Sequence, residues 1–204
     1  MLCSSKIRSY LKMSKIGELG KLVCVGWNKT GTTSMGCAFR ELGFNHWGYC
    51  HPELKKLAKG DLESIFRRAR KHQSFDDWPW HFLYKELDAE FPGSKFVHTV
   101  RDPDEWLVSY RKWREANHKG IEGHNMVGAQ RAAYGKPYLE MTDGELLSCY
   151  ERRLAEVRLY FAMRPKDYLE IDIKDFSSHG WDKLCSFLEL DKPDSPFPHN
   201  NHNP

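Results

Sequence analysis

The sequence predicts one α/β domain in which a parallel β-sheet is flanked by helices. Runs rich in β-forming apolar residues at 21–25, 95–100 and 168–173 have the length of buried strands, and helical patterns lie between them. Strands that alternate with helices form βαβ units, which place the strands parallel and cover both faces of the sheet. The chain has 204 residues, of which 40% are hydrophobic, enough for one substantial core. We therefore expect a single domain at residues 21–204 after a basic extension at residues 1–20.

The elements follow one another regularly from the first strand. A Gly/Thr-rich turn at residues 26–33 leads into a helix that carries Met35, Phe39 and Leu42 on one face. The next predicted elements are helices at 53–59 and 61–72, a short strand at 73–77, a helix from Pro79 to about Glu90, the strand at 95–100, and a helix from Pro103 that carries Trp106, Tyr110 and Trp113.

The second half of the chain begins with a segment rich in helix-breaking residues. Four glycines and one proline at residues 117–137 predict a long mobile connection, which is usually functional when it lies inside a compact domain. The remaining predicted elements are an amphipathic helix at 142–164, the strand at 168–173, a last helix at 181–190 and a Pro/Asn/His-rich tail at 191–204.

Charge and cysteine usage limit the possible functions. The formal net charge of +3 suits an anionic ligand in a local pocket, but it is too small to predict a nucleic-acid partner. The six cysteines form no Cys-x-x-Cys pair, which favours reduced thiols and a cytoplasmic location. The first 20 residues contain four basic residues and no apolar run long enough for a signal peptide or an anchor. We therefore expect no membrane partner and an intracellular ligand, and the sequence does not indicate an oligomeric state.

The turn after the first strand has the features of an anion site. The first N–H groups of a helix have no partner within the helix and carry the positive end of its dipole, so a phosphate or sulfate group fits there. Gly26 and Gly31 have the Gly-x4-Gly spacing of nucleotide-binding P-loops, and Thr33 lies where that motif has Ser or Thr. Thr32 replaces the lysine that normally follows the second glycine, whereas Lys29 lies three positions earlier. This displacement favours a charged group near the end of a shorter phosphate chain.

The same turn resembles the loop of sulfotransferases that use 3'-phosphoadenosine 5'-phosphosulfate (PAPS), which reads roughly Pro-Lys-Ser-Gly-Thr-Thr. Asn replaces Pro and Thr replaces Ser in the matching segment, which consists of Asn28, Lys29, Thr30, Gly31, Thr32 and Thr33. Members of this family also carry an Arg at the end of a later strand and a Ser about eight residues further on, and Arg101 and Ser109 have this spacing. The C-terminal segments 181–188 and 196–199 are also similar to the end of small P-loop sulfotransferases.

The resemblance implies a P-loop fold and transfer of a sulfuryl group from PAPS to a hydroxyl or amine of a small-molecule or carbohydrate acceptor, with no metal required. In such an enzyme Lys29 and the N–H groups of residues 31–33 hold the 5'-phosphosulfate and stabilise charge on the bridging oxygen. Arg101 and Ser109 bind the 3'-phosphate, because the planar fork of an arginine suits phosphate oxygens. The structural alternative is that Arg101 pairs with a carboxylate of the following helix.

The residue that takes the proton of the acceptor is expected near the end of the second strand. Family members place a His-x-Pro segment, or a Glu or Asp, near this position, and the matching segment here is Asp77-Trp78-Pro79. Burial beside tryptophans can raise the pKa of Asp77 toward neutrality, which would make it the catalytic base. An aspartate at this position could instead cap the next helix. The alternative bases are Asp76, His81, His118 and His124.

Two other functions share part of these patterns. An ATP-dependent P-loop small-molecule kinase has the same glycine spacing, but it needs a lysine after the second glycine and a strand that ends in a magnesium-binding Asp. A non-enzymatic module that binds polyanions needs basic and aromatic residues interleaved along one face, whereas the basic residues here are interspersed with acidic ones. His46 and His51 could bind a metal, although a surface position is the simpler interpretation for two histidines in a loop without a paired thiol.

Overall fold

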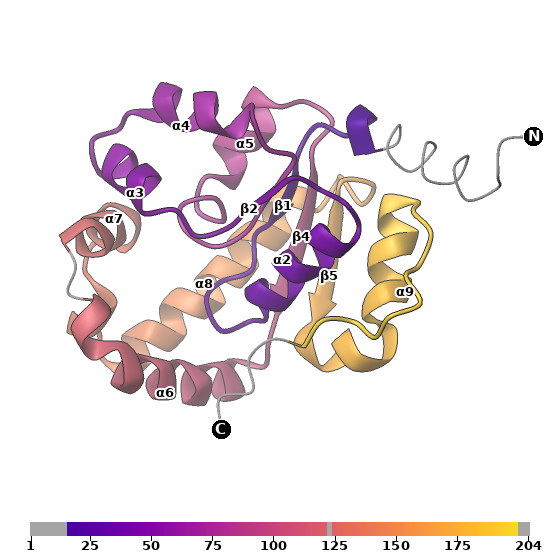
Figure 1. The fold of residues 1–204 in the computed structure, drawn as a ribbon. Helices are drawn as coiled ribbons and strands as arrows, with labels where there is room; N and C mark the ends of the chain where they lie inside the picture. The colour runs from indigo at the N-terminus through magenta and orange to yellow at the C-terminus, as the bar shows by residue number, and fades with distance from the viewer. Residues whose placement is uncertain (1–15, 122–123, 200–204) are drawn as a thin grey trace, which may run out of the picture.

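The computed structural model describes residues 16–121 and 124–199, which contain a five-stranded sheet (Figure 1). The strands are β1 (Leu22–Cys24), β2 (His46–Trp47), β3 (Ser74–Phe75), β4 (Lys95–Val100) and β5 (Tyr168–Asp172). Their order in the sheet is β2-β3-β1-β4-β5, and every neighbouring pair is parallel. The predicted α/β fold with a parallel sheet is therefore confirmed.

Helices cover both faces of the sheet because the residues of β1 alternate between two cores (Figure 1). The helices are α2 (Thr32–Glu41), α3 (His51–Ala58), α4 (Leu62–Ala69), α5 (Tyr84–Glu90), α6 (Pro103–Ile121), α7 (His124–Tyr134), α8 (Asp143–Phe161) and α9 (Phe176–Leu188), with short 3-10 helices η1 (Tyr138–Glu140) and η2 (Ile173–Asp175). Leu22 and Cys24 pack into one core with α2 and α9. Val23 and Val25 pack into the opposite core with α4, α5 and α8. Burial on both faces explains why β1 is apolar throughout.

The carboxyl ends of the central strands meet at one edge of the sheet. Val23 of β1 lies in register with Phe75 of β3 and with Phe96 of β4. The segments that follow these three strands therefore emerge at the same edge, which faces α6 at the bottom of Figure 1. Ligands of open α/β sheets bind outside the carboxyl ends of the strands, so this is the edge at which a site is expected.

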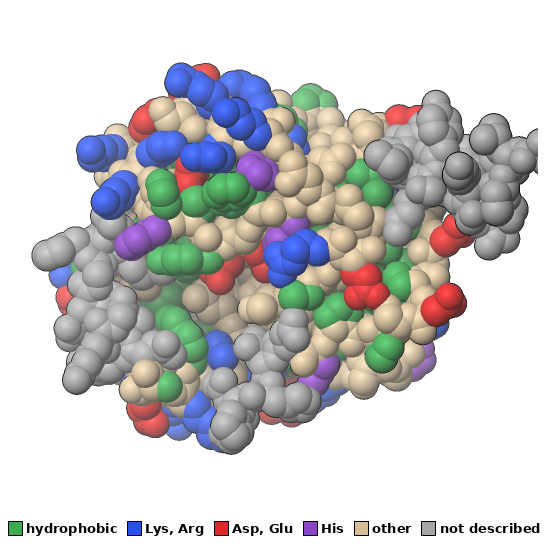
Figure 2. All heavy atoms as spheres, viewed as in Figure 1, with side chains coloured by type: hydrophobic (Ala, Val, Ile, Leu, Met, Phe, Trp, Pro, Cys, Tyr) green, Lys and Arg blue, Asp and Glu red, His purple; other side chains and the backbone are tan. Residues whose placement is uncertain are grey.

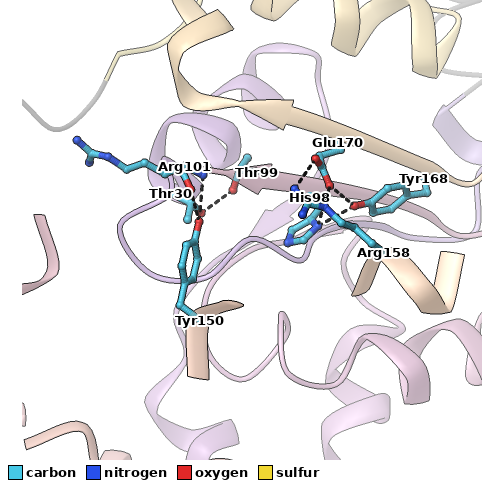
Figure 3. Close-up of polar contacts among 8 residues, drawn as sticks. All are labelled: Thr30, His98, Thr99, Arg101, Tyr150, Arg158, Tyr168 and Glu170. Atoms are coloured by element: carbon cyan, nitrogen blue, oxygen red, sulfur yellow. Dashed lines mark hydrogen bonds and ion pairs between the residues drawn. The ribbon is translucent and has the colours of Figure 1, made fainter. Parts of the chain in front are cut away.

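A chain of polar contacts that starts at the buried His98 links β4 to β5 (Figure 3). His98 Nδ1 lies 2.7 Å from Tyr168 Oη, and the Tyr168 hydroxyl donates to Glu170 Oε2 at 2.9 Å. Arg158 of α8 donates two hydrogen bonds to the same carboxylate. Burial lowers the pKa of His98 to about 3, so its imidazole is neutral in the folded protein.

Residues 117–137, predicted as a long mobile connection, are largely helical. The helix α6 continues to Ile121, and α7 covers His124–Tyr134. A glycine inside a helix costs about 1 kcal/mol relative to alanine, but tertiary packing can override this preference. Here α7 packs against α3, and Ala129 of α7 is fully buried. The prediction was wrong because composition does not include this long-range contact.

Several shorter elements also differ from their predicted bounds. The strand β2 was not predicted, because two residues carry no readable periodicity and β2 is held by its pairing with β3. The strand predicted at 73–77 is reduced to Ser74–Phe75. The helix predicted from Pro79 begins at Tyr84, and the last helix begins at Phe176. Apart from β2, these differences lie at element ends, where local sequence signals are weakest.

Lys and Arg side chains gather over α3 and α4 at the upper left of Figure 2. Lys56 and Arg68 pair with Glu53, whose side chain is fully buried, and Arg70 pairs with two further glutamates. These ion pairs reduce the charge that this surface can offer to a polyanion. Within the described ranges, none of the helices combines the length and the apolar character needed to cross a membrane.

Candidate active site

The Gly/Thr-rich turn after β1 is held against β4 by Thr30. Thr30 is fully buried, and its Oγ1 donates to the carbonyl oxygen of Trp27 at 2.6 Å. The same Oγ1 lies 2.8 Å from Thr99 Oγ1 of β4 (Figure 3). A Cβ atom on Gly26 would come within 1.8 Å of the Thr99 hydroxyl, so only glycine allows this close approach.

The helix α2 begins directly after this turn. Gly31 has a φ of 89°, a left-handed conformation that favours glycine, and its carbonyl oxygen accepts from the Met35 N–H at 3.0 Å. No side chain caps the start of α2, and its first turn contains no acidic residue. The positive end of the helix dipole is therefore not neutralised by its own first turn, as an anion site requires.

A cavity of about 400 Å³ lies beside this turn and α6. Four Lys and Arg side chains line it against one glutamate, and this excess of positive charge favours an anionic ligand. The cavity brings together four of the predicted site residues, Lys29, Gly31, Arg101 and Ser109, from two separate segments of the chain. The other lining residues are Ser34, Glu105, Val108, Lys112, Ile173, Lys174 and His199.

Lys29 lies at the outer edge of the turn and is partly buried. Burial lowers its pKa, and the charge of Arg101 lowers it further. The two cations therefore destabilise each other in the free protein. An anion that contacts both would stabilise the charged form of Lys29, which is the electrostatic arrangement expected of a binding site.

Tyr150 of α8 fixes the backbone of Arg101 at the end of β4 (Figure 3). The Arg101 N–H donates to Tyr150 Oη at 3.0 Å, and the Tyr150 hydroxyl donates to the Arg101 carbonyl oxygen at 2.9 Å. The Arg101 side chain extends away from Tyr150 and lies 3.7 Å from Glu105. Its Nε has no hydrogen-bond partner among the described residues. The predicted pairing with a carboxylate therefore exists, but it is too long to be a hydrogen bond.

The remaining predicted loop residues support the turn from its edges. The carbonyl oxygen of Asn28 accepts a hydrogen bond from Trp106 Nε1 at 2.8 Å, which attaches the turn to α6. Thr32 is buried, whereas Thr33 is exposed at the start of α2. Together with Thr30, these residues shape the turn, and the cavity lining given above includes none of the four.

The seven other lining residues were not predicted as site residues, and four of them could contact an anion: Ser34, Lys112, Lys174 and His199. Lys112 lies one helical turn after Ser109 on α6, so helical periodicity could have indicated it. Ser34 directly follows the matching segment of the turn. Lys174 and His199 come from η2 and from the C-terminal segment, and only the fold brings these to the cavity.

Asp77 follows β3 in a left-handed backbone conformation with a φ of 61°. Its Oδ1 accepts a hydrogen bond from the Trp78 N–H at 2.7 Å. Burial, together with the charge of Asp76, raises the pKa of Asp77 to about 6. A carboxylate with this pKa can accept a proton near neutral pH. The side chain is not among those that line the basic cavity.

Asp76 is held by structural contacts instead. Its Oδ1 lies 3.2 Å from His46 Nε2, and His46 Nδ1 lies 2.9 Å from Ser74 Oγ. A Cβ atom on Gly36 of α2 would lie 2.6 Å from the other oxygen of Asp76. The surface position predicted for His46 is wrong, since its side chain is fully buried in this pair.

The other base candidates are less accessible or are not described. His81 is fully buried, and neither ring nitrogen has a hydrogen-bond partner among the described residues. Burial and the charge of Arg153 lower the pKa of His81 to about 3, which does not favour proton exchange with a ligand. The side chains of His118 and His124 lie outside the described residues. In the described part of the chain, no three His, Cys, Asp or Glu side chains are grouped so that they could hold a metal ion.

Comparisons with known proteins identify relatives over most of the chain. A family model described as "Sulfotransferase domain" matches residues 21–204. The curated "Ava biosynthesis cluster protein M" of Aspergillus versicolor is 25% identical over 213 residues, which cover 88% of this chain and 80% of that protein. The solved "Sulfotransferase Domain from the Synechococcus PCC 7002 Olefin Synthase" shares 14% identity at a TM-score of 0.45, over 85% of this chain and 74% of that one.

Proposed function

The chain belongs to the sulfotransferase family, and we propose on this basis that it transfers the sulfuryl group of PAPS to a hydroxyl or amine of a small-molecule or carbohydrate acceptor. The observation that carries the donor assignment is the basic cavity in which Lys29, Arg101 and Ser109 meet. Lys29 comes from the turn after β1 and the other two from the end of β4 and from α6. Phosphate-binding side chains that reach one cavity from separate segments suit a nucleotide with phosphate groups at both its 3' and 5' positions.

In this proposal Lys29 and the N–H groups of residues 31–33 hold the 5'-phosphosulfate. Negative charge develops on the bridging oxygen as its bond to sulfur breaks, and a cation placed there stabilises the transition state. The lowered pKa of Lys29 supports this assignment, because an anion beside it relieves the unfavourable burial of its charge. The chemistry then depends mostly on positioning and electrostatics, as in phosphoryl transfer.

Arg101 and Ser109 bind the 3'-phosphate, and Lys112 adds a further cation one helical turn beyond Ser109. Glu105 lies 3.7 Å from Arg101 and 2.9 Å from Lys174, so it balances both cations in the free protein. A dianionic phosphate outcompetes a single carboxylate for these groups because it carries more charge and more acceptor oxygens. Donor binding is therefore expected to weaken the contacts of Glu105.

Asp77 takes the proton of the acceptor as the acceptor attacks sulfur in line with the leaving phosphate. Its pKa of about 6 leaves the carboxylate ionised at pH 7 and makes it a stronger base than an ordinary aspartate. Because Asp77 lies outside the lining of the donor cavity, the acceptor has to occupy the space between this carboxylate and the sulfuryl group.

The direct test of the function is incubation of the protein with sulfur-labelled PAPS and a panel of hydroxylated metabolites and glycans. We expect one acceptor class to gain the label, and we expect Lys29→Ala to abolish the transfer. Labelled product that forms equally with the Lys29→Ala variant would assign the reaction to another site or to a contaminant.

A binding experiment separates this function from the kinase alternative. The desulfonated product 3',5'-diphosphoadenosine should raise the melting temperature without magnesium, since a ligand at about 100 times its dissociation constant adds about 2.7 kcal/mol of stability. ATP with magnesium should raise it much less, because Thr32 occupies the position of the nucleotide-binding lysine. A larger stabilisation by ATP with magnesium would favour the kinase.

A further inference from the structure

A second cavity, of about 360 Å³, lies between α5, the end of α7 and α8. None of the described residues lines both this cavity and the basic one. Three polar atoms of its lining residues have no hydrogen-bond partner among the described residues: Oη of Tyr84, Oη of Tyr134 and Nε of Arg153. Tyr84 is 1% exposed and Arg153 is 6% exposed. Because buried donors without a partner are unfavourable, a ligand that supplies acceptors here would stabilise the protein.

The guanidinium group of Arg153 is held by two contacts, while its buried Nε makes no hydrogen bond among the described residues. Its Nη2 donates to the carbonyl oxygen of His81, and its Cζ atom lies 4.5 Å from the centre of the Tyr84 ring. Glu156 Oε2 is 3.9 Å from Nη1, beyond hydrogen-bond distance. A guanidinium group held in this way is a strong donor for a carboxylate, and the Tyr84 hydroxyl is a second donor beside it.

The rest of the wall indicates the size and the charge of the ligand. Phe82 and Tyr134 line the cavity with their rings in an edge-to-face arrangement, 6.2 Å apart. A flat apolar body packs well beside such rings. Three Lys and Arg side chains line the cavity against two glutamates, an excess of one positive charge. This balance suits a single negative charge better than a phosphate dianion.

We propose that this cavity is a binding site for a small aromatic carboxylate with one negative charge. The carboxylate accepts hydrogen bonds from Tyr84 Oη and from Arg153 Nε, and the aromatic ring packs against Phe82 and Tyr134. The site is separate from the proposed donor cavity, and its existence does not depend on the identity of the sulfuryl donor.

Isothermal titration calorimetry of the full chain tests the site with benzoate and phenylacetate as ligands. Neither acid carries a hydroxyl or an amine, so binding cannot be that of a sulfuryl acceptor. We expect a dissociation constant on the order of 1 mM or below for at least one acid. Benzamide, the neutral counterpart of benzoate, should bind at least about tenfold more weakly because it lacks the charge. Absence of binding by both acids at about 10 mM, or equal binding of benzamide, would overturn the proposal.

Tyr84→Phe is the variant that tests the donor pair without disturbing the core. It removes only the buried hydroxyl that lacks a partner, so the melting temperature should stay equal or rise. Binding of the acid should weaken roughly 10- to 100-fold, as expected for a hydrogen bond to a charged group. The matched control is Tyr160→Phe, whose ring lies 5.2 Å from that of Tyr84 but whose hydroxyl donates to Asp88. Wild-type affinity in Tyr84→Phe would refute the assigned contact.

A competition experiment tests which of the two cavities binds the acid. Saturating 3',5'-diphosphoadenosine should leave the affinity for the acid unchanged, since the two cavities share no described lining residue. Competition between the acid and the nucleotide would mean that the acid binds in the basic cavity instead. Arg153→Lys should weaken binding of the acid at least about tenfold although the positive charge is retained, because lysine lacks the planar fork of arginine. Equal binding by this variant would also contradict the proposal.

Discussion

Arg101→Ala is the change that most directly tests recognition of the 3'-phosphate. The Arg101 backbone is held by Tyr150 through its N–H and its carbonyl oxygen, and both contacts remain after the side chain is removed. The lost side chain makes only a long ion pair with Glu105, at 3.7 Å. A partly exposed pair at this distance contributes about 0.2–1 kcal/mol, so the fold should remain stable.

The effect on ligand binding should be much larger. A charge-assisted contact to a phosphate is worth roughly 1.5–3 kcal/mol, which corresponds to about 10- to 150-fold in affinity. Affinity for 3',5'-diphosphoadenosine should fall by this factor. Affinity for adenosine 5'-phosphosulfate, which has no 3'-phosphate, should fall no more than a few-fold. The ratio of the two losses, measured by calorimetry, isolates the 3'-phosphate contact from general electrostatic attraction.

Two controls make the outcome decisive. Arg111→Ala removes an arginine from the same helix, but Arg111 binds Asp143 at 2.6 Å and does not line the cavity, so nucleotide affinity should be unchanged. Glu105→Gln removes the carboxylate beside Arg101 and should tighten binding a few-fold. If Arg101→Ala weakens the binding of both nucleotides equally, Arg101 supports the structure and does not bind the 3'-phosphate.

Three further predictions concern the base, its titration and the turn. Asp77→Asn preserves the size of the side chain, and asparagine tolerates the left-handed φ, so nucleotide affinity and melting temperature should stay unchanged while label transfer from PAPS falls roughly 10²- to 10⁴-fold. Undiminished transfer would mean that another residue accepts the proton. Only the ionised carboxylate of Asp77 accepts a proton, and the pKa of Asp77 is raised to about 6, so kcat/KM should fall about tenfold per pH unit below pH 6. A value of kcat/KM that stays constant from pH 7 to pH 5 would contradict the role of Asp77. Gly26→Ala places a Cβ atom within 1.8 Å of Thr99 Oγ1, so the free energy of unfolding, measured by calorimetry, should fall by about 1–3 kcal/mol and nucleotide binding should weaken. The double variant Gly26→Ala/Thr99→Ala should recover part of both losses. If Gly26→Ala alone is as stable as the wild type, the turn is less tightly packed than the structure indicates.

The parts of the fold that the sequence predicted are those with strong local signals. The strand β4 is a run of β-forming residues between a Pro-Gly turn and Pro103, and its observed bounds agree with the prediction. The helix α8 has a regular apolar face, and Thr142 caps its start in a capping box with Glu145. The Gly/Thr-rich turn was also predictable, because Gly26 allows the close approach to Thr99 and Gly31 adopts a left-handed φ of 89°.

The parts that could not be predicted depend on contacts between distant segments. The two-residue strand β2 exists because β3 pairs with it, and the helix α7 forms despite its glycine because it packs on α3. Lys174 and His199 reach the basic cavity only through the path of β5 and the C-terminal segment. The second cavity depends on α5, α7 and α8 together, so neither Tyr84 nor Arg153 carries a local signal for a ligand.

The choice between the two adjacent aspartates shows how structure refines a sequence argument. Alternation along an extended strand predicts that Asp76 and Asp77 face opposite directions, but β3 ends at Phe75 before either of them. They are separated instead by the left-handed backbone of Asp77 and by two glycines, since a Cβ atom on Gly36 or on Gly48 would lie 2.6 Å from an oxygen of Asp76. The glycines admit Asp76 to a buried pair with His46. Burial raises the pKa of Asp77, and the charge of Asp76 raises it further. Asp76 therefore adds to the raised pKa of Asp77, and its pairing with His46 makes Asp77 the better candidate of the two for accepting a proton.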